Sequence, residues 1–148
     1  MSTLRTADDL IAAGLAPEAR RAELAQVAER YAVAVTPVLA AAIIPGMADD
    51  PIARQFVPSG AELEAHAGES GDPIGDEAHS PVRGIVHRYP DRVLLKLVSV
   101  CAVYCRVCFR REMVGPGGET ALTPAALDAA LAYIAAHPEI WEVILTGG

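Results

Sequence analysis

The sequence predicts an α/β fold in which a helical N-terminal region precedes a strand–loop–helix–strand unit. Two observations carry this prediction. Signals that start helices recur through residues 1–57, and two aliphatic runs of strand length, residues 92–100 and 141–146, flank an Ala- and Leu-rich segment. With 148 residues, 52% of them hydrophobic, the chain is long enough to bury a core.

The first 57 residues are expected to form several short helices. Thr6 can cap one helix, with Asp9 three residues later to complete a capping box. Thr36-Pro37 and Asp50-Pro51 repeat the pattern of a capping residue followed by proline, which favours a new helix at each point. This pattern predicts a helical N-terminal region rather than one long helix.

Residues 58–84 are expected to form an irregular connector. Gly and Pro recur through this segment among acids and serines, and the apolar residues show no sustained period. The connector separates the helical region from a third region, residues 85–148.

The third region is predicted to contain one right-handed βαβ unit. Residues 92–100 form a near-continuous aliphatic run, which is typical of a strand covered on both faces in a parallel sheet. Thr123-Pro124 starts a helix that ends before Pro138, and residues 141–146 form a second buried strand. Two parallel strands cannot cover their own faces, so we expect an incomplete fold and the front part of a longer protein.

The charge distribution limits the partners of this chain. Nineteen acidic against twelve basic residues give a net charge of −7, which argues against general binding to nucleic acid or to an anionic membrane. No apolar stretch reaches the roughly 20 residues that span a bilayer, and the N-terminus lacks the pattern of a signal peptide, so we expect a cytoplasmic protein. Basic residues concentrate between residues 83 and 111, where they could attract small anions; arginines lying along a helix face are the alternative.

All three cysteines lie within eight residues, with the spacing C-x3-C-x2-C at Cys101, Cys105 and Cys108. An odd number in a cytoplasmic chain argues against a disulfide framework. Three thiolates on one loop can bind a metal centre. A structural zinc would need a fourth ligand such as His87 or His79, whereas an iron–sulfur cluster held by three cysteines keeps one iron open. Inert buried cysteines and a redox pair of Cys105 with Cys108 are further alternatives.

The motifs around these cysteines resemble those of a known family. C-x3-C-x2-C after the first strand of a barrel is the signature of radical S-adenosylmethionine (SAM) enzymes. Residues 87–92 (HRYPDR), 105–111 (CRVCFRR) and 145–148 (LTGG) resemble the lysine 2,3-aminomutase family. The resemblance runs from about residue 72 to residue 148, and it implies that the third region begins a radical SAM partial (β/α) barrel.

The resemblance implies a set of cofactors. Cys101, Cys105 and Cys108 would ligate three irons of a [4Fe-4S] cluster, and SAM would chelate the fourth iron and be cleaved to a 5′-deoxyadenosyl radical. Gly147 and Gly148 would begin a glycine-rich turn that contacts SAM, although the same pair also suits a plain turn.

The resemblance also implies a pyridoxal 5′-phosphate (PLP) site and a substrate site. Arg88 and Arg92 would hold the phosphate of PLP, with Tyr89 packed nearby. Without the resemblance, these arginines would be interpreted as solvated or as paired with Asp91. Arg110 would bind the α-carboxylate of the substrate in a bidentate geometry.

The implied activity is that of an isomerase that converts L-lysine to β-lysine by migration of the 2-amino group to C3. An external electron donor such as flavodoxin or ferredoxin is implied, and a homo-oligomer is compatible with the resemblance. Phe109, directly after Cys108, resembles the branch that makes β-lysine for attachment to elongation factor P, and Val107 stands where some members carry histidine. The only lysine, Lys96, is not assigned as the Schiff-base lysine, so no catalytic residue is assigned and the 148-residue chain alone is expected to be inactive.

Two alternatives from other classes remain at this point. One is a non-catalytic zinc or iron–sulfur binding module, and the other is a different radical SAM chemistry on the same barrel start. Metal content and the effect of SAM on the bound metal would separate the module from the enzyme.

Overall fold

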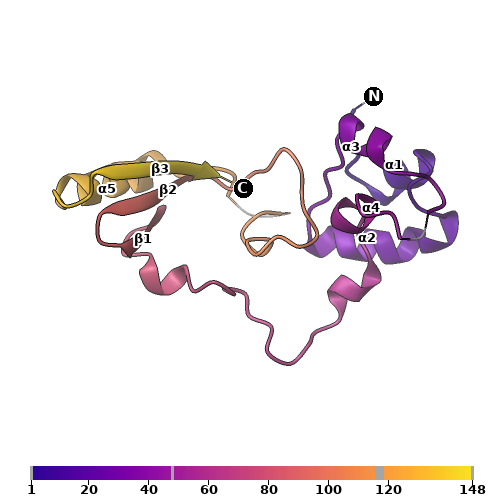
Figure 1. Cartoon of the computed structure of the whole chain (residues 1–148), viewed down its shortest axis with the longest axis horizontal. Coiled ribbons are helices and arrows are strands. Elements are labelled where there is room, and N and C mark those ends of the chain that lie inside the picture. The colour runs from indigo at the N-terminus through magenta and orange to yellow at the C-terminus, as the bar shows by residue number, and fades with distance from the viewer. Residues whose placement is uncertain (1, 48, 116–118, 148) are drawn as a thin grey trace. The chain divides into compact units, whose positions relative to one another are not determined.

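The computed structural model describes residues 2–47, 49–115 and 119–147. The chain divides into two compact units, which are coloured by residue number in Figure 1. The helical unit contains Met1–Glu69 and Cys101–Pro116, and the sheet unit contains Ser70–Val100 and Gly117–Gly148. The cysteine-containing segment therefore packs with the N-terminal helices, although it follows the first predicted strand in the sequence.

Threonine side chains cap two helices of the helical unit. The Thr6 hydroxyl accepts a hydrogen bond from Asp9 N, and the Asp9 carboxylate accepts one from Thr6 N, so the predicted capping box is confirmed. The Thr36 hydroxyl caps a second helix by accepting from Leu39 N, and Pro37 occupies the first position of this helix. The α-helices of this unit are α1 Ala7–Ala12, α2 Arg21–Arg30, α3 Pro37–Ala42 and α4 Ala53–Phe56, and 3-10 turns span Glu18–Arg20 and Gly60–Leu63.

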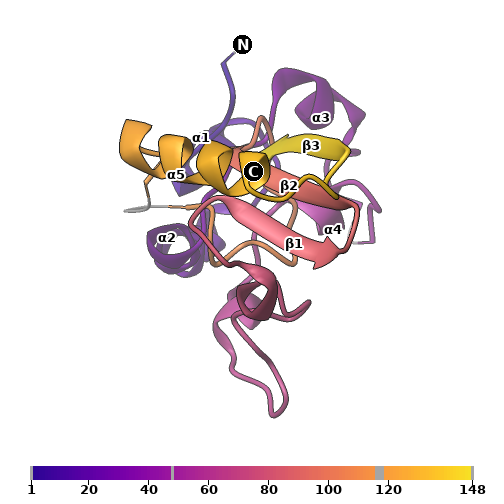
Figure 2. The ribbon, with the colours of Figure 1, turned by 90° about the vertical axis from the view of Figure 1, so that its left-hand side faces the viewer.

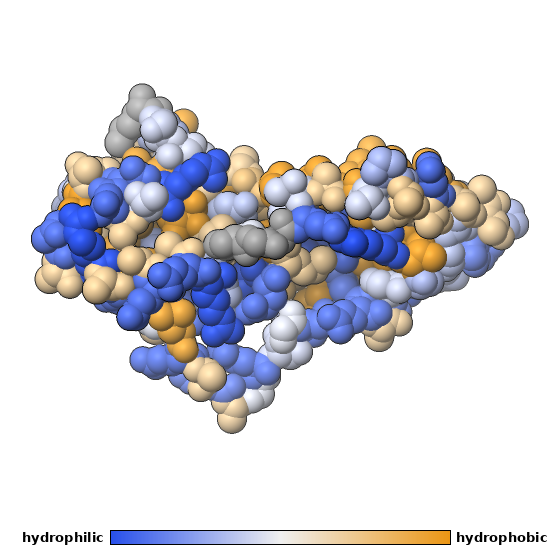
Figure 3. Space-filling view, turned by 180° about the vertical axis from the view of Figure 1, so that it is seen from behind, coloured by the Kyte–Doolittle hydropathy of each residue, from blue (hydrophilic) through white to orange (hydrophobic). Residues whose placement is uncertain are grey.

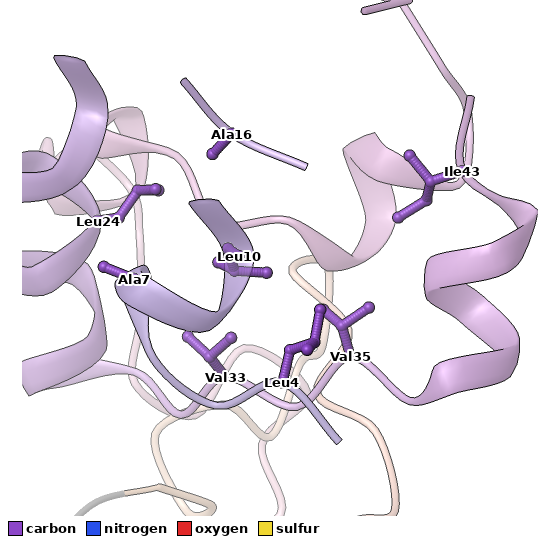
Figure 4. Close-up of a cluster of buried hydrophobic side chains, with 8 residues drawn as sticks. All are labelled: Leu4, Ala7, Leu10, Ala16, Leu24, Val33, Val35 and Ile43. Atoms are coloured by element: carbon purple, nitrogen blue, oxygen red, sulfur yellow. The ribbon is translucent and has the colours of Figure 1, made fainter. Parts of the chain in front are cut away.

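The core of the helical unit lies between α1, α2 and α3. Leu10, Leu24 and Val35 are completely buried, and Figure 4 shows them pointing toward one another with the other members of this cluster. Asp50 of the same unit is a buried carboxylate that accepts hydrogen bonds from the backbone N–H groups of Ile44, Ile52 and Ala53. These hydrogen bonds, chiefly that from Ala53, hold the pKa of Asp50 below its usual value.

The sheet unit contains a three-stranded mixed sheet with the order β1-β2-β3. Its strands are β1 Ile85–Tyr89, β2 Arg92–Val98 and β3 Glu142–Gly147, and α5 Pro124–Ala135 lies between β2 and β3 in the chain. β2 and β3 are parallel, with Leu94 opposite Ile144, so the predicted strand–helix–strand unit is present. β1 pairs antiparallel with β2 as a hairpin, which the sequence analysis did not predict. A short 3-10 turn, Glu77–His79, precedes the hairpin.

One face of this sheet is covered by α5, as Figure 2 shows. Ala130 of α5 packs against Ile85, Val93 and Leu95, and all four residues are buried. The prediction that the second strand is buried is wrong, because β3 lies at an edge of the described sheet and its side chains are largely exposed; Leu145 is 66% exposed. β2 is covered on alternate residues rather than on both faces. Hydrophobic atoms are visible on the surface of this unit in the right half of Figure 3.

The arrangement is α/β, as predicted. Three strands and one helix do not make a (β/α) barrel, so the predicted barrel stays a prediction. In the part of the chain that the structure describes, no helix is long and apolar enough to cross a membrane.

Candidate metal centre and cofactor-binding residues

The three cysteines lie on one irregular loop of the helical unit and line a common pocket. Their thiols are free and half-buried. The loop is held by successive turns, in which Cys108 N donates to Cys105 O at 3.2 Å and Arg111 N donates to Cys108 O at 3.3 Å. The remaining lining residues of this pocket are Tyr31, Ala32, Glu62, Val103, Tyr104, Arg106, Arg111 and Val114.

The electrostatics of the pocket suit a cationic centre. Burial raises the pKa of the Cys101 thiol, and the neighbouring Cys108 and Cys105 raise it further because three thiolates in one pocket repel one another. A bound cation would relieve this repulsion. The backbone N–H of Arg110 donates to the Cys108 sulfur at 3.4 Å, a type of hydrogen bond that stabilises thiolate ligands and tunes iron–sulfur clusters.

The donor set of this pocket is three thiols. Within the described residues, no three His, Cys, Asp or Glu side chains are already gathered around a single ion position. A structural zinc would need a fourth protein ligand, whereas an iron–sulfur cluster binds each of three cysteines to a different iron and leaves the fourth iron open. Three cysteines therefore fit a cluster without a further protein donor.

Arg106, between the second and third cysteines, anchors the loop to the N-terminal helices. Its guanidinium donates to the Glu62 carboxylate through Nε and Nη2, and Nη1 donates to Ala32 O at 2.7 Å. Arg111 stacks on the ring of Tyr31, with its guanidinium carbon 4.4 Å from the ring centroid. The loop therefore has fixed walls on the side of the helices.

Arg110 and the two apolar residues near the cysteines lie toward the surface. The Arg110 guanidinium carbon is 5.0 Å from the ring centroid of Phe109, which is 50% exposed. Val107 is 78% exposed. Arg110, the candidate for the substrate carboxylate, is thus near the cysteines but its side chain does not line their pocket.

The candidate PLP residues Arg88, Tyr89 and Arg92 lie on the β1–β2 hairpin, where the two arginines have different partners. Arg92 Nε and Nη2 donate to the two Asp91 oxygens at 2.9 and 2.8 Å, so the alternative that pairs these residues is observed for Arg92. The pKa of Asp91 is lowered to about 2, chiefly by its side-chain hydrogen bonds from Arg92. Arg88 donates to Ile74 O at 2.6 Å and lies 3.3 Å from the carboxylate of Asp76.

Comparison with known proteins identifies relatives, although no family model matches the chain. L-lysine 2,3-aminomutase of Clostridium subterminale is 37% identical over 125 residues, which are 84% of this chain and 30% of that protein. The enzyme of the same name from Escherichia coli K12 is 44% identical over 103 residues, 70% of this chain and 29% of that protein. For L-lysine 2,3-aminomutase of Bacillus subtilis the identity is 39% over 114 residues, 77% of this chain and 24% of that protein.

The chain belongs to the lysine 2,3-aminomutase family. It spans about a third or less of the length of the relatives that it matches. The family resemblance stated from the HRYPDR, CRVCFRR and LTGG motifs is thereby confirmed, while the roles of individual residues within those motifs stay predictions.

Gly147 of this lysine 2,3-aminomutase family chain has a structural reason to be glycine. It pairs with Val98 at a register shift between β2 and β3, and a Cβ at this position would collide with the Val98 side chain. The close approach of the two strands therefore favours glycine whether or not SAM binds here. Gly148, the second candidate of this pair, lies outside the described residues.

Two groups in this aminomutase-family chain escaped the sequence analysis. Glu62 lies 44 positions before Arg106, so no local pattern points to it. A cluster of aromatic side chains joins β1 to α5. His87 Nδ1 is 2.7 Å from the Tyr133 hydroxyl, and the ring centroids of Tyr133 and His137 are 4.0 Å apart. His87 Nε2 is buried without a hydrogen-bond partner among the described residues.

Proposed function

We propose that the chain is part of an aminomutase that converts L-lysine to β-lysine by moving the amino group from C2 to C3. The proposal is supported by relatives named L-lysine 2,3-aminomutase and carried by one observation, the lining of a single pocket by Cys101, Cys105 and Cys108. The same argument favours a [4Fe-4S] cluster, SAM and PLP as cofactors, and the start of a radical SAM barrel in the sheet unit.

The cysteine loop would hold the cluster. When bound, the cluster with SAM would supply radical chemistry, and PLP would supply the chemistry for migration of the amino group. Cys101, Cys105 and Cys108 would each bind one iron, and the Arg110 N–H would continue to donate to the Cys108 sulfur. Tyr31 and Val114 on the pocket wall would exclude water, since both are almost completely buried.

The arginines would hold the anionic groups of cofactor and substrate. Arg110 is proposed to bind the α-carboxylate of lysine, and Arg88 and Arg92, with Tyr89, the phosphate of PLP. Both phosphate candidates are paired with carboxylates in this structure, Arg88 with Asp76 and Arg92 with Asp91. The phosphate would therefore share or displace these partners. Gly147 and Gly148 are proposed to approach SAM through their backbone.

The wider context is also a proposal. We place the enzyme in the cytoplasm with flavodoxin or ferredoxin as electron donor, and Phe109 favours the branch that supplies β-lysine to elongation factor P. Lys96, the only lysine, lies within β2 and is not proposed as the Schiff-base lysine. We expect the 148-residue chain alone to bind a cluster without forming β-lysine.

The test is anaerobic reconstitution of the full chain with ferrous iron and sulfide. We expect about four irons per chain and an electron paramagnetic resonance signal of the reduced cluster that changes when SAM is added. One tightly bound zinc with no effect of SAM would contradict the enzyme and favour the non-catalytic module.

Substitution of the cysteines refines this test. The variants Cys101→Ala, Cys105→Ala and Cys108→Ala should each abolish stable iron binding. Each variant leaves only two of the three thiolates that would anchor the cluster. Val107→Ala is the matched control, since this exposed residue of the same loop does not line the pocket. Wild-type iron content in any of the three cysteine variants would remove that cysteine from the ligand set.

A further inference from the structure

Arg110, the candidate for the substrate carboxylate, is held at its backbone on both sides. Its N–H donates to the Cys108 sulfur at 3.4 Å, and its carbonyl oxygen accepts from Met113 N at 2.9 Å. The next residue, Arg111, packs over the ring of Tyr31, which is almost completely buried. The backbone of Arg110 is therefore fixed, whereas its long side chain still has several rotatable bonds.

The side chain of Phe109 contacts the guanidinium of Arg110. The guanidinium carbon lies over the ring, 5.0 Å from its centroid, which is within the range of a cation–π interaction. This attraction is to the face of the ring, so it leaves the N–H groups of the guanidinium for hydrogen bonds to an anion. An aromatic ring can therefore hold a guanidinium without cancelling its charge, whereas a carboxylate would cancel it.

Packing alone is a poor explanation for Phe109. Its side chain is half-exposed, and it is not among the described residues that line the cysteine pocket. A half-exposed ring gains less from burial than a core residue does. The interaction that distinguishes this ring from an aliphatic side chain is the contact with Arg110.

We propose that Phe109 is a positioning residue that orients the Arg110 guanidinium for the α-carboxylate of the substrate amino acid. This inference rests on the proposed function, in which Arg110 binds that carboxylate. Contact with the ring restricts the arginine side chain before the ligand arrives, so less conformational freedom is lost on binding. An arginine without the ring would spend part of its time in other rotamers, and its apparent affinity would fall accordingly.

The experiment compares carboxylate binding by the metal-free full chain and its variants. Acetate is the probe because it carries only the carboxylate, and chloride at the same ionic strength is the reference for general anion binding. Binding is followed by nuclear magnetic resonance through the Nε–H signal of Arg110, which is assigned by its absence in Arg110→Lys. Thermal unfolding of each variant reports on the fold.

The variants at position 109 differ in the aromatic face that they offer. Phe109→Leu keeps a large apolar side chain without a ring, and its dissociation constant for acetate should rise about 2- to 5-fold, as expected for loss of an exposed cation–π contact. Phe109→Trp offers a stronger face and should bind acetate at least as tightly as the wild type. Val107→Ala, the matched control on the same loop, should leave the constant unchanged because Val107 is exposed.

The order of acetate affinities separates positioning from a purely structural role. A structural role would follow the melting temperatures of the variants rather than the presence of an aromatic ring. Wild-type acetate affinity in Phe109→Leu would overturn the proposal, and so would an equal loss of affinity in Phe109→Trp and Phe109→Leu. The titration needs no iron, so failure of iron binding would remove the proposed cluster while the acetate affinities still decide the role of Phe109.

Discussion

Each arginine that the sequence motifs single out for an anion in the sheet unit is already paired with a carboxylate. Arg88 lies against the buried Asp76, and Arg92 forms a two-pronged pair with Asp91. A neutralised guanidinium attracts a phosphate less strongly than a free one. The affinity of this hairpin for an anion therefore depends on how easily the two ion pairs, Arg88–Asp76 and Arg92–Asp91, can be broken.

The Asp91–Arg92 pair predicts an acid-dependent contribution to stability. The pKa of Asp91 falls to about 2 in the folded chain, chiefly because of Arg92, whereas an unfolded Asp titrates near 3.9. A lowered folded pKa stabilises the fold fully above about pH 4 and loses that effect as the pH falls toward 2. Thermal unfolding at stepped pH should therefore show the wild-type advantage over Asp91→Asn shrinking across this interval.

Two controls belong to this prediction. Glu139→Gln changes an exposed carboxylate of the same unit and should follow the wild-type acid profile. A carboxyl resonance of Asp91 that titrates near 4 in nuclear magnetic resonance would contradict the pairing.

At the scale of single elements, α5 begins at a side-chain cap that the sequence already indicates. The Thr123 hydroxyl accepts from Ala126 N at 3.2 Å, and Pro124 occupies the first position of the helix. Thr123→Ala should lower the free energy of unfolding by about 1 kcal/mol, measured by urea denaturation. Thr123→Ser retains the hydroxyl and should stay close to the wild type, and equal stability of all three proteins would contradict the cap.

The elements that the sequence predicted are those specified by local patterns. Caps and prolines located α1, α3 and α5, and aliphatic runs located β2 and β3. β1 was missed because its second half, His-Arg-Tyr, is polar and its strand character comes from pairing with β2. The exposure of β3 was missed because an apolar run predicts a strand but not what covers it.

In the candidate site, too, the residues set by local spacing were predicted and those brought in by the fold were not. The C-x3-C-x2-C spacing predicted that Cys101, Cys105 and Cys108 lie together, and all three line one pocket, while their roles as ligands stay predictions. Glu62 and Ala32 could not be found from the sequence, since they meet Arg106 across 44 and 74 positions of chain. Contacts of that kind follow from the fold as a whole.

At the scale of the whole chain, exposed apolar side chains gather on β3 and just before it. Trp141 is 70% exposed and Leu145 66%. Exposed apolar edge strands pair with other copies of themselves, so we expect the chain to self-associate and to be poorly soluble. In sedimentation experiments, the mean mass should rise with concentration for the wild type and less for Leu145→Lys.

The control for this prediction is an exposed apolar residue of the other unit. Val38 of α3 is 80% exposed, and Val38→Lys should leave the association as it is in the wild type. A wild-type chain that stays monomeric throughout the concentration series would show that β3 does not mediate self-association.

The order in which the two units share the chain has a consequence for synthesis on the ribosome. The helical unit is interrupted in the sequence by residues 70–100, which contain the β1–β2 hairpin of the sheet unit. The cysteine segment, which follows them, belongs to the helical unit again. The first four helices can form while translation continues. The hydrogen bonds between Glu62 and Arg106 can form only after another 44 residues have been added. At roughly 5–20 residues per second, that delay lasts seconds, during which the pocket wall exists without its thiols. Cys101, Cys105 and Cys108 therefore emerge into a helical unit that has already begun to fold, and they add the last wall of their pocket to it.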